Sequence, residues 1–234
     1  MTRTSSFDLR GALRNNNNNN KQECQDAVVN ALAPALSEGV DSITDLLFLP
    51  WGNAYVNISK CGTEDYSKQA MYCWIQECGV SDPDDACFDE SNKICQHSTE
   101  ECDANLAEAC ARKYSPSQYA FVSFLACFEK AEGDMSALES CASDSKIDVD
   151  NFNTCRNSSE GVELDMNNAR ATAQFGSSRL GTPWIVVNGK HIDTPSDLRE
   201  EICKAYTGTD KPKGCTSSSS SRNLRQVSSS PRLC

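Results

Sequence analysis

Fourteen cysteines give this sequence most of its chemical potential, and their spacing is unusual for redox chemistry. A cysteine thiolate can attack a disulfide or bind a metal ion, and two cysteines can form a structural bridge. Dithiol redox sites usually carry a C-x-x-C pair, and no two cysteines of this chain have that spacing. The first question is therefore which sulfurs react and which hold the fold together.

Cys24 lies at the expected start of a helix, because Ala27, Val28 and Ala31 follow it at helical spacing. The helix dipole and the unpaired backbone N–H groups of a helix start favour the thiolate form of a cysteine. This position would make Cys24 reactive toward disulfides. The alternative is a buried structural cysteine, since cysteine also packs as a small apolar residue.

Pro183 is the second candidate, in the segment Thr182-Pro183-Trp184 that leads into a β-branched run. In thiol–disulfide enzymes of the thioredoxin type, a cis-proline at the start of this strand lies beside the reactive cysteine. The neighbouring backbone can pair with an extended substrate, as an added strand would. The alternative is an ordinary proline at a strand entry, which is common.

Three cysteines and a histidine form the densest cluster, from Cys95 to Cys110 with His97 between them. Zinc sites usually present cysteines in close pairs, with about two to four residues between them. Here six and seven residues separate consecutive cysteines, which favours structural disulfides over zinc, and we expect no metal site. A cysteine nucleophile paired with His97 or His191 is a weaker alternative.

The cysteine content also indicates a compartment. Such a chain is typical of a secreted or endomembrane protein with several disulfides, and glycosylation sequons at Asn57 and Asn157 fit that location. The net charge of −11 argues against a nucleic-acid partner, and no apolar run is long enough for a membrane span. Residues 1–14 lack the apolar core of a signal peptide, so we expect that the natural chain starts differently.

The length of 234 residues allows one well-packed domain with tails. We expect a disordered or unreliable N-terminus over 1–21, because the run Asn15–Asn20 can bury nothing. The domain spans 22–210, with a cysteine-rich, mostly helical insertion over 60–160, and a disordered serine-rich tail follows over 211–234. Four cysteines early in the insertion suggest local disulfides without fixing their pairing: Cys61, Cys73, Cys78 and Cys87.

Hydrophobic spacing predicts a helical block before the candidate proline. Pro34 should end or kink the first helix early, and Leu46–Leu49 is expected to form a short buried strand. Further helices are expected over 100–113, 117–131, 134–141, 148–155 and 161–175.

The spacing of the hydrophobic residues changes from helical to strand-like after the helical block. The run Trp184–Val187 predicts a strand, and Asn188-Gly189 is a strong signal for a hairpin that returns through Lys190–Ile192. Thr194-Pro195 begins a final helix that ends near Tyr206. The fold class is therefore α/β with an inserted helical block.

The densest cysteine cluster carries the pattern C-Q-H-x-x-x-E-C-x-x-N-x-x-x-x-C. This pattern resembles the signature of the gamma-interferon-inducible lysosomal thiol reductase family. The matching residues are Cys95, Gln96, His97, Glu101, Cys102, Asn105, Glu108 and Cys110. The family usually has glycine after the histidine, where this chain has Ser98.

Other segments resemble the family in the same order along the chain. Pro50-Trp51-Gly52-Asn53-Ala54 is similar to an upstream family element, and Pro183–Gly189 is similar to the closing cis-proline and strand. Three cysteines follow the signature at family-like intervals: Cys127, Cys141 and Cys155. The resemblance covers roughly Cys24 to Tyr206.

The resemblance implies a thioredoxin-like fold with a disulfide-rich helical insertion. In this family a reactive C-x-x-C begins the first helix after an apolar strand. Cys24 resembles the second cysteine of that pair, and Lys21 stands where the first is expected. The first strand is expected to be missing or degraded, because the asparagine run takes its place. The N-terminus is then either truncated or misassembled, or it is divergent. The joint absence of a signal peptide, the first strand and the first cysteine favours truncation or misassembly.

By resemblance, we expect a thiol–disulfide oxidoreductase that reduces protein disulfides through a mixed disulfide and that is impaired by the lost first cysteine. The catalytic candidates are Cys24 and Pro183. The structural disulfide candidates are Cys95, Cys102, Cys110, Cys127, Cys141 and Cys155. Its partners would be disulfide-containing proteins and a small-molecule thiol reductant, with no cofactor, in a lysosomal or secreted location. The alternative is a non-catalytic, disulfide-rich secreted binding protein on the same scaffold.

Overall fold

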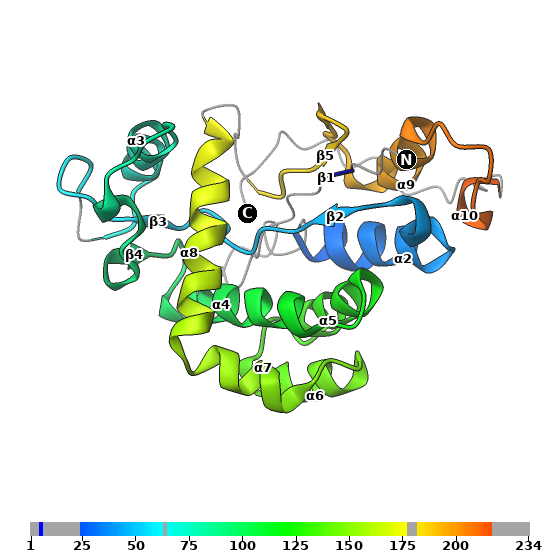
Figure 1. Cartoon of the computed structure of the whole chain (residues 1–234), viewed down its shortest axis with the longest axis horizontal. Helices are drawn as coiled ribbons and strands as arrows, with labels where there is room; N and C mark the ends of the chain where they lie inside the picture. Colours follow the sequence, from blue (N-terminus) through cyan, green and yellow to red (C-terminus); the bar gives the residue numbers. More distant parts are fainter. Residues whose placement is uncertain (1–4, 7–23, 63–64, 177–181, 217–234) are drawn as a thin grey trace.

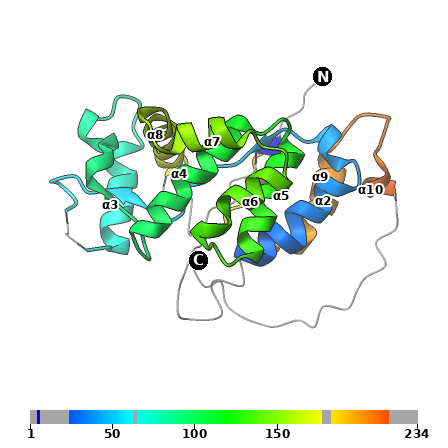
Figure 2. The same cartoon turned by 90° about the horizontal axis from the view of Figure 1, so that it is seen from below.

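A computed structural model gives the structure of the chain and describes residues 5–6, 24–62, 65–176 and 182–216. The described part is mostly helical, with short strands between the helices (Figure 1). Helix α3 lies at one end of the elongated molecule, and α9 and α10 lie at the other (Figures 1 and 2). The expected α/β class therefore holds loosely, because helices dominate and the strands are very short.

The strands of the described residues form three pairs. Strand β1 pairs in parallel with β2, while β3 pairs with β4 and β5 pairs with β6 in antiparallel fashion. Strand β1 also lies beside β5 (Figure 1). Their bounds are Ser5–Ser6, Leu46–Leu47, Tyr55–Val56, Lys93–Ile94, Val186–Val187 and Lys190–His191. Strand β1 lies upstream of the asparagine run and has only two residues, so the expectation of a missing or degraded first strand stays a prediction.

The first helix continues past its proline. A π-helical segment over Asp26–Leu32 passes directly into α2 over Ala33–Ser37. Pro34 occupies the first turn of α2, where its missing N–H group is tolerated. The expected early end of the helix is therefore wrong, and the proline instead marks a change from π-helical to α-helical hydrogen bonding.

The helical block forms the main hydrophobic core with the first helix and α9. Its helices are α4 (Thr99–Tyr114), α5 (Gln118–Lys130), α6 (Leu138–Asp144), α7 (Val149–Arg156) and α8 (Ser159–Gln174). Ser117 and Asp148 cap α5 and α7 by accepting backbone N–H groups with their side chains. These helices lie close to the ranges expected from hydrophobic spacing.

A second core surrounds α3 (Lys68–Cys78), which packs against α8. Its largest side chains are Trp51 and Trp74, whose rings stack with centroids 6.0 Å apart. The disulfides Cys61–Cys73 and Cys78–Cys87 join α3 to the segments on either side. Short 3₁₀ turns complete this region over 85–88 and 90–92. The four cysteines are thus paired locally.

The chain after the helical block follows the expected hairpin and helix. Asn188 and Gly189 have φ values of 47° and 83°, which match the two left-handed positions of a type I′ turn. A 3₁₀ turn over Pro195–Asp197 leads into α9 (Leu198–Ala205). Structure continues through α10 (Lys213–Thr216), which a Cys203–Cys215 disulfide joins to α9. The start of the expected disordered tail, residues 211–216, is therefore folded.

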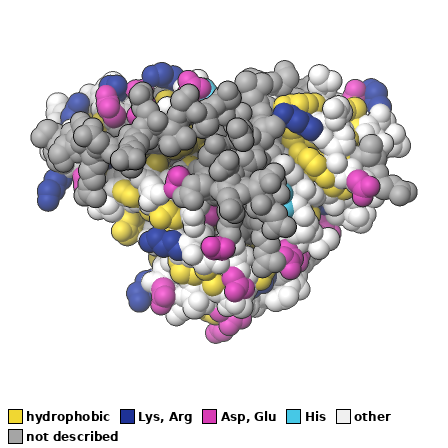
Figure 3. Space-filling view, turned by 180° about the vertical axis from the view of Figure 1, so that it is seen from behind, with side chains coloured by type: hydrophobic (Ala, Val, Ile, Leu, Met, Phe, Trp, Pro, Cys, Tyr) yellow, Lys and Arg dark blue, Asp and Glu magenta, His cyan; other side chains and the backbone are white. Residues whose placement is uncertain are grey.

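The negative net charge is visible on the surface. Acidic side chains are spread over the face shown in Figure 3, including its lower part, with basic side chains between them. Within the described residues, no helix is long and apolar enough to cross a bilayer.

Candidate functional site

Cys24 lies in helical backbone that continues without a break into the π-helical segment Asp26–Leu32. Its side chain is buried, with an exposed fraction of 2% for the residue, and its sulfur is disulfide-bonded. A disulfide-bonded sulfur is not a nucleophile, because the thiolate is the attacking species. Any reaction at Cys24 must therefore begin with reduction of that disulfide.

Pro183 follows a cis peptide bond with Thr182. This is the geometry that the family resemblance implied for the proline. Thr182 is buried, Pro183 is half-buried, and the chain continues through Trp184 toward β5. The backbone here lies at a strand entry, where an extended peptide could add as a further strand.

A hydrogen-bonded group of three polar side chains supports the cis-proline loop. Asn53 donates through Nδ2 to Oε1 of Gln96 at 2.7 Å and to Oγ1 of Thr182 at 3.5 Å. Asn53 and Thr182 are buried, so the loss of these contacts would leave polar atoms away from water. The three residues come from three separate segments of the family resemblance. The structure thus joins the upstream element, the signature and the cis-proline loop.

The signature itself is organised around the start of α4. The Cys95–Cys102 disulfide ties the preceding segment to the first turn of the helix. The backbone N–H of His97 donates to Oε2 of Glu101 at 2.7 Å, and Nδ1 of His97 lies 3.2 Å from the same oxygen. Asn105 donates through Nδ2 to the backbone oxygen of Trp51 at 3.2 Å. The polar residues of the signature therefore hold neighbouring backbone in place.

Ser98 departs from the family glycine without strain. It is the N-cap residue of α4, with φ at −177°. This is extended backbone, which any residue adopts. The departure at Ser98 therefore leaves the geometry of the signature intact.

Three carboxylates are buried between α4 and α5: Glu101, Glu108 and Glu129. Burial raises the pKa of Glu108 well above its ordinary value, and the nearby charges of Glu129 and Glu101 raise it further. Gln25, the neighbour of Cys24, donates through Nε2 to the backbone oxygen of Glu129 at 2.7 Å. This acidic cluster therefore lies beneath the first helix and favours proton uptake.

The raised pKa of Glu108 predicts that this residue stabilises the fold more in acid than at neutral pH. The folded state keeps a proton that the unfolded state releases near the ordinary glutamate pKa. This stabilisation is complete below the unfolded pKa and is lost as the pH rises through the folded pKa. We expect the urea midpoint to fall from about pH 5 to about pH 8, and Glu108→Gln to flatten that dependence by at most about 1.4 kcal/mol per pH unit.

A matched control is Glu160→Gln in α8. The pKa of Glu160 is lowered, first by its hydrogen bond from Lys113 and then by that from Tyr114. Its contribution to stability therefore has the opposite sign and is lost only as the pH falls through its folded pKa. Above about pH 5 this control should leave the slope unchanged. Equal slopes for the parent chain and Glu108→Gln would contradict the prediction.

The glycosylation and disulfide candidates lie in segments of the chain other than the loop around Pro183. Asn157 is exposed at the end of α7 and Asn57 is half-buried, and glycosylation at both stays a prediction. The six cysteines proposed as structural form the disulfides Cys95–Cys102, Cys110–Cys155 and Cys127–Cys141. Across the described ranges, no group of histidine, cysteine and acidic residues has a metal-binding arrangement.

Comparison with known proteins shows to which family the chain belongs. The family model described as "Gamma interferon inducible lysosomal thiol reductase (GILT)" matches residues 84–145, which contain the whole signature. A protein of Arabidopsis thaliana named "Gamma-interferon-responsive lysosomal thiol protein" is 30% identical over 202 residues, which are 84% of this chain and 72% of that relative. The chain belongs to the gamma-interferon-inducible lysosomal thiol reductase family.

Two animal relatives named "Gamma-interferon-inducible lysosomal thiol reductase" are also similar. The protein of Mus musculus is 30% identical over 125 residues, covering 53% of this chain and 50% of the relative. The protein of Carassius auratus is 26% identical over 199 residues, covering 82% of this chain and 66% of the relative. The chain thus spans half of one animal thiol reductase and less than the full length of the other.

Proposed function

We propose that this chain is a thiol–disulfide oxidoreductase of thioredoxin-like architecture that reduces protein disulfides. The observation that carries the proposal is the hydrogen bonding of Asn53 to Gln96 and Thr182, which joins the family signature to the loop that contains Pro183. Such a loop offers backbone groups to an extended peptide. Cys24, in the first helix, supplies the sulfur. Family membership supports the same chemistry.

The reaction consumes two molecules of a small-molecule thiol for each disulfide reduced. External thiol first opens the Cys24 disulfide and leaves the Cys24 thiolate. This thiolate attacks one sulfur of the substrate disulfide, forming a mixed disulfide and releasing the other substrate sulfur as a thiolate. One external thiol then displaces the remaining substrate sulfur, and a second one regenerates Cys24. The substrate gains two electrons and two protons, and the external thiols become a disulfide.

The lost first cysteine makes this cycle slow. In a dithiol cycle, the second cysteine resolves the mixed disulfide within the same molecule. Lys21 stands where the first cysteine is expected, so resolution depends on external thiol. We therefore propose that the chain is an impaired reductase that acts through Cys24 alone.

Cys24→Ser tests this role. Turnover of a fluorescent disulfide-linked protein is measured with a fixed concentration of small thiol, with and without the chain. The chain should raise the rate above that of thiol alone, and Cys24→Ser should return the rate to that background, because serine forms no mixed disulfide. Cys127→Ser, which opens a disulfide of the helical block, is the control and should keep its turnover. Equal rates for the parent chain and Cys24→Ser would refute the proposal.

A non-catalytic binding protein is the second candidate. The buried and disulfide-bonded state of Cys24 favours it. In that case the chain would not raise the rate at any pH, and Cys24 would resist alkylation after mild reduction. The proposed location, lysosomal or secreted, suits both candidates, since the disulfides of the described residues persist in oxidising compartments.

A further inference from the structure

A buried ion pair joins β4 to α8 in the second core. Lys93 donates through Nζ to Oδ2 of Asp165, and the two side chains are only 4% and 1% exposed. The same ammonium group lies 4.6 Å from the ring centroid of Trp51 and donates to the backbone oxygen of Cys102 at 3.4 Å. Lys93 therefore connects α8, the signature helix α4 and the side chain of Trp51.

Trp51 belongs to the turn that carries Asn53. The backbone oxygen of Trp51 accepts the N–H group of Ala54 at 3.2 Å and Nδ2 of Asn105 at 3.2 Å. Asn53 lies inside this turn and donates to Thr182 of the proposed substrate loop. The position of Trp51 therefore helps to set the position of Asn53.

Two buried polar atoms beside the ion pair lack partners. Nε1 of Trp51 and Oδ1 of Asp165 have no hydrogen-bond partner among the described residues, although neither residue is more than 1% exposed. Buried polar groups are normally paired with protein or with ordered water, because an unpaired group keeps its full desolvation penalty. Both residues contact the ammonium group of Lys93, which brings them close to each other.

The chemistry of the two atoms selects the ligand. An indole N–H can only donate, and a carboxylate oxygen can only accept. Asp165 would repel an anion, whereas Lys93 would repel a cation, and a cation could not accept a hydrogen bond from the indole. A water molecule accepts one hydrogen bond and donates another, so it can bridge both atoms.

We propose that one buried water bridges Nε1 of Trp51 to Oδ1 of Asp165 and, together with Lys93, holds the turn that positions Asn53. Lys93 and Asp165 are then positioning residues, which act on the substrate loop through Trp51. The inference rests on the proposed function only for the use of that loop. The bound water and the order of the turn are measured without turnover, so a chain that reduces no disulfide still tests them.

Nuclear magnetic resonance of the full chain tests the water directly. Burial raises the pKa of Asp165 to about 6, so its carboxyl is ionised at about pH 7.5. The indole N–H of Trp51 should then show a rotating-frame Overhauser cross-peak to a long-lived water. The indole N–H of Trp74 is the internal control, because it donates to the backbone oxygen of Cys87 at 3.0 Å and should show none. Trp51→Phe and Trp74→Phe assign the two signals, and a missing water cross-peak at Trp51 would overturn the inference.

The double variant Lys93→Met with Asp165→Leu tests the positioning role. It replaces a buried ion pair by apolar side chains of similar size, which proteins often tolerate, and it leaves the site dry. We expect hydrogen exchange at the backbone N–H of Ala54 to accelerate roughly tenfold. The N–H group of Phe121, which donates to the backbone oxygen of Ser117 in the main core, should exchange at its parent rate.

Two further variants control this experiment. Lys60→Met with Glu77→Gln removes an exposed ion pair of α3 and should change neither exchange rate. Trp51→Phe keeps a ring and removes the N–H donor, so it should also accelerate exchange at Ala54. Unchanged exchange at Ala54 in Trp51→Phe would overturn the positioning role, whether or not the double variant folds. Equal acceleration at Ala54 and Phe121 would overturn it too, because the loss of stability would then be global.

Discussion

Lys21→Cys is expected to raise disulfide-reductase turnover roughly 100-fold, because it supplies an attacking thiol whose mixed disulfide Cys24 can resolve within the same molecule. The substitution creates the spacing C-x-x-C with Cys24 at its second position. An intramolecular thiol acts at an effective concentration far above that of a millimolar external reductant. The new cysteine attacks the substrate disulfide, and Cys24 then displaces the substrate as the two sulfurs form a disulfide. External thiol is needed only to reduce that disulfide.

Two controls separate this effect from the loss of the lysine charge. Lys21→Ser removes the ammonium group without adding a thiol and should leave turnover near that of the parent chain. The double variant Lys21→Cys with Cys24→Ser, reduced beforehand and freed of external thiol, should trap the substrate as a stable mixed disulfide, which mass spectrometry detects, because no resolving thiol remains. Turnover by Lys21→Cys at the level of Lys21→Ser would show that Cys24 is not the resolving half of a redox pair.

Local patterns predicted most of the helical elements. The helix at 99–114 follows from apolar residues at helical spacing, and the hairpin at 186–191 follows from a two-residue turn. Pro34 misled the prediction, because a π-helical segment before it and its place in the first turn of α2 let the helix continue. The folded segment at 213–216 was missed, since composition does not reveal that Cys203 pairs with Cys215.

The candidate site was predictable only in parts. The sequence supplied Cys24, Pro183 and the signature as separate motifs, and family resemblance gave their proposed roles. It did not show that Asn53 bonds to Gln96 and Thr182, because those contacts span 43 and 129 residues of chain. Hydrogen bonds at such separations depend on the packed fold and leave no periodic signal. The stack of Trp184 on His191 was missed for a similar reason, since cross-strand contacts depend on the hairpin register.

The Cys110–Cys155 disulfide should contribute most to stability among the bridges of the described residues. It joins α4 to α7 across 45 residues, the largest separation among the bridges whose two cysteines both lie in the described residues. The loss of loop entropy in the unfolded chain predicts about 4 kcal/mol for this bridge, against about 3 kcal/mol for Cys61–Cys73, whose separation is 12. Cys110 and Cys155 are both fully buried. Replacing them with smaller residues would leave a cavity, which would lower the free energy of unfolding further.

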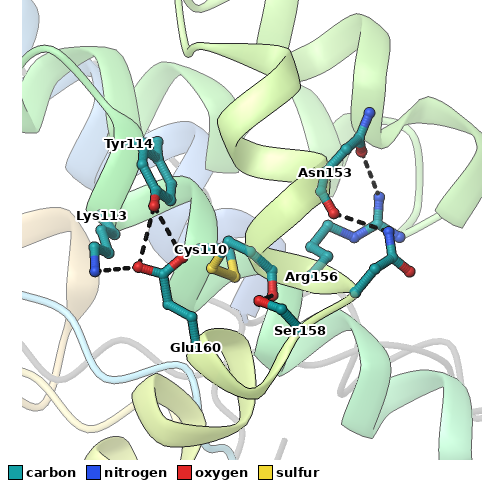
Figure 4. Close-up of a disulfide and its surroundings, with 9 residues drawn as sticks. Cys110, Lys113, Tyr114, Asn153, Arg156, Ser158 and Glu160 are labelled. Atoms are coloured by element: carbon teal, nitrogen blue, oxygen red, sulfur yellow. Dashed lines mark hydrogen bonds and ion pairs between the residues drawn. A yellow bond between two sulfur atoms is a disulfide. The ribbon is translucent and has the colours of Figure 1, made fainter.

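Contacts between α4 and α8 lie beside the Cys110–Cys155 disulfide (Figure 4). A side chain at Gly161 would come within 3.3 Å of Sγ of Cys110, so α8 approaches the bridge closely. Beside it, Glu160 accepts a hydrogen bond from the Tyr114 hydroxyl at 2.9 Å and pairs with Lys113 (Figure 4). Loss of the bridge would therefore loosen the contact between α4 and α8 as well as release the loop.

The double variant Cys110→Ala with Cys155→Ala tests this account by urea unfolding, with Cys61→Ala and Cys73→Ala as the matched control. The first variant should lose about 4 kcal/mol or more, and the control should lose roughly 1 kcal/mol less. A larger loss from the control would mean that the second core around α3, and not the loop between α4 and α7, limits stability. Because the family signature ends at Cys110, the expected result would assign this last signature cysteine to the stability of the helical block.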